Sequence, residues 1–160
     1  MITISAFKWV PEFAQGQVRD LRARWALEEA GLPYRTRLLK QGDQDQPDYR
    51  AKQPFGQVPI LEENGLVLFE SGAIVLHIGE RSEMLLPKDA GARARATQWL
   101  IAALNSIEPF VMNVATIDLF HANDYPGRRI NGDRDNRPAR RGDGAAPFGS
   151  ELLNRIAIAV

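Results

Sequence analysis

The chain contains 160 residues, of which 44% are hydrophobic and 25% are charged, a balance typical of one ordinary globular domain or two small ones. Its 20 basic and 20 acidic residues cancel, so the overall charge gives no support for a nucleic-acid or membrane partner. The absence of cysteine excludes disulfides, a thiolate nucleophile and any cysteine-based metal site.

The start of the sequence indicates no targeting segment. Met1 to Ile4 lacks the basic lead of a signal peptide, and no apolar run reaches the length that spans a bilayer. We therefore expect a cytoplasmic protein without a membrane partner. The two histidines, His77 and His121, are too few for a histidine-rich site, so no metal is expected.

The first part of the chain alternates between strand and helix patterns. Ile2 to Phe7 and Tyr34 to Leu39 alternate in polarity, as strands do. Between them, Val18 to Ala30 predicts a helix that ends at Gly31, with Pro33 just beyond. Its two apolar stripes predict that it is covered on two sides. The stripes are Val18, Leu21 and Trp25, and Ala23, Leu27 and Ala30.

A hairpin follows a polar segment. Gln41 to Lys52, which contains Pro47, predicts a loop with a short helix. Val58 to Leu61 and Leu66 to Phe69 predict two strands. They are joined at Asn64-Gly65, a pair that supplies the positive φ of a tight turn.

A further helix follows the hairpin directly. The apolar string from Ala73 through Ile78 predicts it, with Ser71 as the N-cap and an end near Arg81. The resulting order is β-α-β-α-β-β-α, with mixed strand directions. We therefore predict an α/β, thioredoxin-like domain over residues 1–81.

Pro59 lies inside the first strand of the hairpin. Because proline cannot donate to a ladder, it belongs at a strand start or an edge, where a neighbouring residue can pair with a peptide-like ligand. The N-terminus of the helix that begins at Ser71 suits a carboxylate. The alternative is that this strand is only an edge of the sheet that ends at the proline, without a ligand.

These residues resemble the glutathione-binding half of the glutathione S-transferase family. The family pattern Asn-Pro-x-Gly-x-Val-Pro-x-Leu stands at residues 53–61 as Gln53-Pro54-Phe55-Gly56-Gln57-Val58-Pro59-Ile60-Leu61, and the family's Glu-Ser pair stands at Glu70-Ser71. The resemblance implies a cis bond before Pro59. It also implies that Gln57, Val58 and Pro59 bind glutathione, with the Val58 main chain pairing with the cysteinyl unit. Glu70 and Ser71 would hold the γ-glutamyl end.

The resemblance further implies thiolate chemistry, with glutathione as co-substrate and no metal. A thiol with a pKa of about 8.5 must be helped to ionise by a hydrogen bond or a helix N-terminus. Family members usually place a Ser, Cys or Tyr just after the first strand, but residues 8–19 contain none of the three. Our catalytic candidates are Gln17, through its amide or N–H, and Arg19, through its charge. The alternative is that Gln17 only caps the helix and that Arg19 is a solvated surface charge.

Four other residues are candidates for ligand contacts. Trp9 and Phe13 could line an apolar site for an electrophile, the alternative being core packing. Family likeness places Lys40 and Gln53 where the glycyl end of glutathione is often contacted.

A helical region is expected after a linker at residues 82–88. Asp89 can cap a long helix, and Pro109 should kink or divide it. Residues 89–120 resemble the start of the family's all-helical C-terminal domain, which is incomplete here. In the family this domain helps form the dimer interface, so a homodimer is expected. The apolar positions that step by four and three are Leu100, Leu104, Ile107, Val111 and Val114.

Residues 121–160 predict an atypical, disordered tail. Residues 121–149 hold three prolines and five glycines, and six arginines lie between Arg128 and Arg141, with little apolar periodicity. A nucleic-acid or acidic-lipid segment and a functional disordered tail are alternatives. We favour loss of the remaining helical domain, through truncation or a frameshift, because no lysine follows Lys88.

The family resemblance implies a glutathione transferase that conjugates or reduces small electrophiles, as in detoxification. The alternatives are a non-catalytic glutathione-binding or scaffold protein and an inactive truncated relic. The expected partners are glutathione, a small-molecule electrophile and a second copy of the chain, with no nucleic acid and no membrane.

Overall fold

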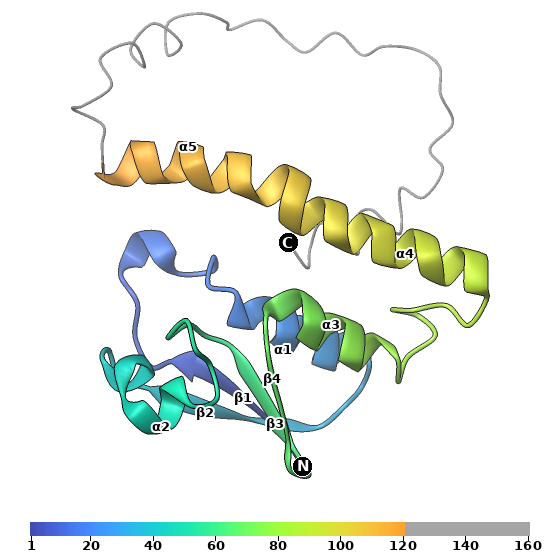
Figure 1. Cartoon of the computed structure of the whole chain (residues 1–160), viewed down its shortest axis with the longest axis horizontal. Helices are drawn as coiled ribbons and strands as arrows, with labels where there is room; N and C mark the ends of the chain where they lie inside the picture. Colours follow the sequence, from blue (N-terminus) through green and yellow to red (C-terminus); the bar gives the residue numbers. More distant parts are fainter. Residues whose placement is uncertain (121–160) are drawn as a thin grey trace, which may run out of the picture.

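A mixed four-stranded sheet forms the centre of the N-terminal part in the computed structural model, which describes residues 1–120 (Figure 1). The strand order is β2-β1-β3-β4, with β1 parallel to β2 and β3 antiparallel to both of its neighbours. The predicted thioredoxin-like arrangement is therefore confirmed. The expected disordered tail lies outside the described residues. The strands are β1 (Ile2–Phe7), β2 (Tyr34–Leu39), β3 (Ile60–Glu63) and β4 (Leu66–Phe69).

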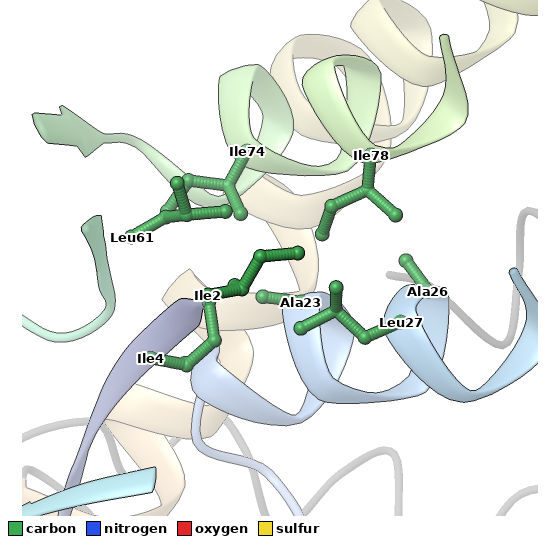
Figure 2. Packing of buried hydrophobic residues seen from close by; sticks show 8 residues of the cluster. All are labelled: Ile2, Ile4, Ala23, Ala26, Leu27, Leu61, Ile74 and Ile78. Carbon is green, nitrogen blue, oxygen red and sulfur yellow. The ribbon is translucent and has the colours of Figure 1, made fainter. Parts of the chain in front are cut away.

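Helices cover the two faces of this sheet. On one face, α1 (Asp20–Glu29) and α3 (Ser71–Gly79) enclose the main core (Figure 2). On the other face, the short helix α2 (Pro47–Arg50) packs through Tyr49 against a second cluster. Neighbouring residues of β3 point to opposite faces, as strand geometry requires. The main core contains Ile2, Ile4, Ala23, Ala26, Leu27, Leu61, Ile74 and Ile78, and the second cluster contains Leu39, Tyr49, Val58 and Ile60.

Local signals in the sequence explain two of the turns. Asn64 and Gly65 have φ of +49° and +85°, which confirms the predicted turn between β3 and β4. The prediction that α1 is covered on two sides is wrong. Only the stripe of Ala23 and Leu27 is buried, whereas Trp25 is exposed and its indole donates to Glu29.

A long helix crosses over α1 and α3 (Figure 1). It consists of α4 (Ala90–Ala102), a π-helical turn (Ala103–Ile107) and α5 (Glu108–Phe120). Of the two predicted effects of Pro109, a kink or a division, the helix shows no division. The wide π turn directly before the proline changes the carbonyl positions with which its ring would otherwise clash, so the helix continues.

This long helix also corrects the expectation about apolar runs. By length and composition, Ala90–Ile117 could cross a membrane, with an 18-residue window of mean hydropathy 1.4, of which 17% is buried. Single polar residues such as Asn105 and Glu108 interrupt the run in the sequence, but the average over the helix stays apolar. In the structure, this helix packs against α3 beside the sheet domain.

Asp89 caps the long helix, as predicted. Its Oδ1 accepts a hydrogen bond from the Ala92 N–H at 2.7 Å. We expect Asp89→Ala to lower the free energy of unfolding by about 1 kcal/mol, because an N–H of the first turn loses its acceptor. Urea unfolding would measure this loss. Asp89→Asn should retain most of the stability, and equal losses in both variants would contradict a capping role.

Candidate functional site

A cavity of 690 Å³ lies between the sheet domain and the long helix. It brings together four of the sequence-predicted site residues, Gln17, Arg19, Gln57 and Val58. One wall comes from the loop before α1 and the segment before β3, and the other comes from α4 to α5. The lining side chains from the long helix are Trp99, Ala103, Ile107, Glu108, Val111 and Met112.

The main chain at Val58 lies at the end of the sheet. The Val58–Pro59 peptide bond is cis, as the family resemblance implied. Pairing of β3 with β4 begins only at Ile60, opposite Phe69. Over residues 1–120, Val58 takes part in no backbone–backbone hydrogen bond. Its N–H and C=O are therefore available to an extended ligand in the cavity.

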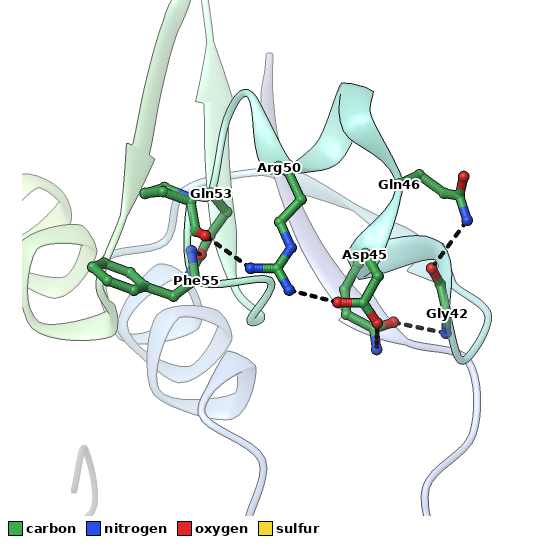
Figure 3. A network of polar contacts seen from close by, with 8 residues as sticks. Gly42, Asp45, Gln46, Arg50, Gln53 and Phe55 are labelled. Atoms are coloured by element: carbon green, nitrogen blue, oxygen red, sulfur yellow. Dashed lines mark hydrogen bonds and ion pairs between the residues drawn. The ribbon is translucent and has the colours of Figure 1, made fainter.

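The loop that leads to Val58 is held by a polar network around Arg50 (Figure 3). The Arg50 guanidinium donates to the Pro54 carbonyl at 2.8 Å and to Asp45 at 2.7 Å. Gly56 has φ of +63°, and a Cβ there would lie 2.6 Å from the Arg50 guanidinium carbon. The positive φ favours glycine at this position, and a larger residue would also displace the Arg50 guanidinium.

Ser71 is the first residue of α3 and not its N-cap, which corrects the prediction. Glu70 occupies the cap position with φ of +68° and makes no side-chain capping bond. The Ser71 hydroxyl is buried and accepts a hydrogen bond from Arg22 Nη1 at 3.3 Å. Glu70 and Ser71 line an adjoining cavity of 550 Å³, which shares Arg19, Arg22, Glu108 and Met112 with the first.

Glu108 connects the long helix to α1 through two arginines. Its carboxylate lies 2.7 Å from Arg19 Nη2 and 3.0 Å from Arg22 Nη2, and the Glu108 and Arg22 side chains are each 10% exposed. Arg19 therefore has a carboxylate partner, although its side chain remains 41% exposed. Glu108 is not among the sequence-predicted site residues, and the sequence of α5, which also contains Asp118, does not single it out.

The ion pairs determine the protonation of Glu108. Burial by itself would raise the pKa of this carboxyl, but hydrogen bonds from Arg22 and Arg19 bring the pKa below its ordinary value. Two cations and one anion leave a single net positive charge between the two cavities. That charge favours an anionic group of a ligand.

The lowered pKa of Glu108 predicts a pH dependence of stability. A depressed folded-state pKa stabilises the fold above the unfolded-state pKa of about 4.3, and this contribution is lost as the pH falls through the folded-state value. We expect wild type to be more stable than Glu108→Gln at pH 7, and the difference to shrink at pH values below about 4. Urea unfolding of both proteins across pH would measure it. A difference that is independent of pH would contradict the ion-pair assignment.

The other predicted site residues lie elsewhere. Trp9 and Phe13 are exposed and do not line the cavity, where Phe7 and Trp99 supply aromatic rings instead. Lys40 is exposed outside the cavity, and its N–H donates to Asp43. Gln53 is buried, with its Oε1 accepting from the Phe55 N–H at 2.6 Å, so it supports the loop from inside.

Gln17 lies at the cavity wall but is not a helix cap. Its N–H donates to the Ala14 carbonyl at 3.1 Å, and α1 begins three residues later. The main-chain N–H is therefore already used inside the turn. The exposed side-chain amide is the part of Gln17 that can reach a ligand.

Comparisons with known proteins agree with this arrangement. Residues 14–80 match the family described as "Glutathione S-transferase, N-terminal domain". Glutathione S-transferase 4 of Zea mays is 37% identical over 92 residues, covering 55% of this chain and 41% of that protein. Disulfide-bond oxidoreductase YfcG of Escherichia coli is 32% identical over 96 residues, covering 53% and 44%.

Solved structures share the fold. A glutathione transferase family member from Pseudomonas fluorescens, solved with two glutathione molecules bound, superimposes with a TM-score of 0.66 at 26% identity, covering 80% of this chain and 56% of that one. The chain spans about half the length of the curated relatives it matches.

Proposed function

We propose that this chain, whose residues 14–80 match the N-terminal domain of the glutathione S-transferases, binds glutathione along Val58 and α3 and uses the thiolate to conjugate or reduce a small electrophile. The single observation that carries the proposal is the Val58 main chain, which lines the cavity with no backbone partner over residues 1–120. An extended peptide can pair with it, as a strand pairs with a sheet edge.

The two ends of glutathione meet different surroundings in this proposal. Its γ-glutamyl carboxylate reaches the N-terminus of α3, where free N–H groups and the Ser71 hydroxyl can donate hydrogen bonds to it. Its cysteinyl unit lies along Val58. The sulfur then lies near the Gln17 amide and the net positive charge of Arg19, Arg22 and Glu108. This charge favours the thiolate over the thiol.

The wall from the long helix suits the electrophile. Trp99, Ile107, Val111 and Met112 line the same cavity and present apolar surface opposite Val58. We also propose that the protein acts in the cytoplasm as a homodimer. The exposed aromatic pair Phe55 and Phe69, with ring centroids 6.1 Å apart, supports a contact with a second copy.

A second function, glutathione binding without turnover, is supported by one specific observation. Residues 8–19 contain no Ser, Cys or Tyr, so no hydroxyl or thiol from this loop can activate the sulfur. Calorimetric titration with glutathione and an assay with a generic aryl halide separate the two. Binding with turnover supports the transferase, binding without turnover supports the second function, and no binding contradicts both.

Ser71→Ala tests the proposed γ-glutamyl site. We expect glutathione binding to weaken about tenfold, because a buried hydroxyl that bonds a carboxylate is lost. Ser82→Ala is the matched control, since Ser82 follows the other end of α3. Isothermal calorimetry would measure both affinities. Unchanged affinity in Ser71→Ala, or an equal loss in both variants, would remove Ser71 from the site.

A further inference from the structure

Two buried hydroxyl groups connect the ends of the segment from Gln57 to Ile60, which contains Val58. Ser5 of β1 is 1% exposed and Tyr49 of α2 is 6% exposed. Their oxygens lie 2.9 Å apart. The Ile60 N–H donates to Ser5 Oγ at 2.8 Å, and the Tyr49 hydroxyl donates to the Gln57 carbonyl at 2.8 Å.

The direction of this chain of hydrogen bonds is fixed. The Gln57 carbonyl can only accept, so Tyr49 uses its single proton there. The Tyr49 oxygen must then accept from the Ser5 hydroxyl, whose own oxygen accepts from Ile60. Each hydrogen bond is therefore donated in the same direction, from Ile60 to Ser5, from Ser5 to Tyr49 and from Tyr49 to Gln57. Bonds arranged in this way polarise and strengthen one another.

Ser5 takes over where the main-chain ladder ends. Register between β1 and β3 pairs Thr3 with Glu62 and Ile4 with Leu61, and it stops there. The next residue along β1 is Ser5, and its hydroxyl supplies the acceptor for Ile60 in place of a carbonyl. The backbone beyond the ladder is thereby held without a strand partner, which leaves Val58 open to the cavity.

We propose that Tyr49 and Ser5 are positioning residues that hold the Val58 main chain at the spacing needed to pair with an extended thiol peptide, an inference that rests on the proposed function. Both ends of the segment from Gln57 to Ile60 are tied to the sheet domain, at α2 and at β1. Between them, the Val58 side chain is anchored in the second core cluster. Neither Tyr49 nor Ser5 lines the cavity, so both act on the ligand through Val58.

The state of the Tyr49 hydroxyl agrees with this role. Burial raises its pKa above the ordinary value for tyrosine, against smaller opposing effects from Ser5 and Arg37. The hydroxyl therefore stays protonated and keeps its bond to the Gln57 carbonyl. The Arg37 guanidinium lies over the Tyr49 ring at 5.9 Å and holds the ring in place.

The experiment compares Tyr49→Phe, Ser5→Ala and the double variant with wild type. Each single variant should weaken glutathione binding about fivefold to tenfold, the effect of one buried hydrogen bond. Because the two hydroxyls belong to one series of hydrogen bonds, the double variant should bind glutathione little worse than either single variant. Tyr34→Phe is the matched control, since the Tyr34 hydroxyl donates to the exposed Glu28 on another part of the surface.

Hydrogen exchange of the Ile60 amide in the ligand-free protein gives a second readout. Tyr49→Phe removes no atom that bonds Ile60 directly, yet it should speed Ile60 exchange about fivefold relative to the Ile4 amide. An unchanged Ile60-to-Ile4 ratio, together with unchanged glutathione affinity, would overturn the inference. If wild type fails to bind glutathione, the proposed function fails, and the exchange ratio alone then decides whether Tyr49 and Ser5 position this segment.

Discussion

Glu108→Ala is expected to lower the free energy of unfolding by about 3 kcal/mol or more, because it leaves a buried guanidinium without its carboxylate. Arg22 has a side chain that is 10% exposed and cannot turn fully to water, whereas Arg19 is 41% exposed and can. Urea unfolding at pH 7 would measure the loss. The effect should be largest on the docking of the long helix, since Glu108 is the first residue of α5.

Glu80→Ala is the matched control for this prediction. Glu80 also links α3 to the long helix, through Arg93, but both side chains of that pair are about half exposed. An exposed pair contributes between about 0 and 1 kcal/mol, so this variant should remain close to wild type. Equal losses in Glu108→Ala and Glu80→Ala would show that burial of the cluster around Glu108 does not matter.

Glu108→Ala should also weaken ligand binding. Arg22 donates to both Glu108 and Ser71, so loss of the carboxylate removes one of the contacts that fix the Arg22 guanidinium beside the Ser71 hydroxyl. Glutathione affinity should then fall in Glu108→Ala by a factor similar to that in Ser71→Ala. This links the helix-docking contact to the proposed γ-glutamyl site, two features that are distant in the sequence.

Local sequence signals were sufficient for most of the N-terminal fold. Alternating side chains identified β1 and β2, and Asn64-Gly65 identified the turn between β3 and β4, because each signal depends on residues that are neighbours in the chain. The Val58 segment was recognised from residues 53–61 for the same reason. Asp89 was also predicted correctly, since a cap bonds an N–H only three residues away.

Long-range contacts explain what the sequence could not provide. Glu108 bonds Arg19 and Arg22 across 89 and 86 residues, and no local pattern marks such a pair. Tyr49 and Ser5 are 44 residues apart and bond through hydroxyls that look unremarkable in a sequence. Ser71 was misplaced as a cap because the positive φ of Glu70 depends on how the hairpin meets α3.

Leu61→Ala is expected to cost about 3 to 4 kcal/mol of unfolding free energy, because it opens a cavity in the main core. Leu61 is fully buried on β3, where it packs with Ile74 and Ile78 of α3. Leu38→Ala makes the same chemical change on β2 at a side chain that is 57% exposed, and should cost less than about 0.5 kcal/mol.

Urea unfolding followed by tryptophan fluorescence would measure both variants, since Trp25 lies on α1 and Trp99 on α4. If the sheet domain and the long helix unfold as one unit, Leu61→Ala should shift a single transition. Two separated transitions would show that the long helix is held more weakly than the Glu108 cluster implies. The cavity would then be complete only in molecules whose long helix is docked, because Trp99, Glu108 and Met112 form one of its walls.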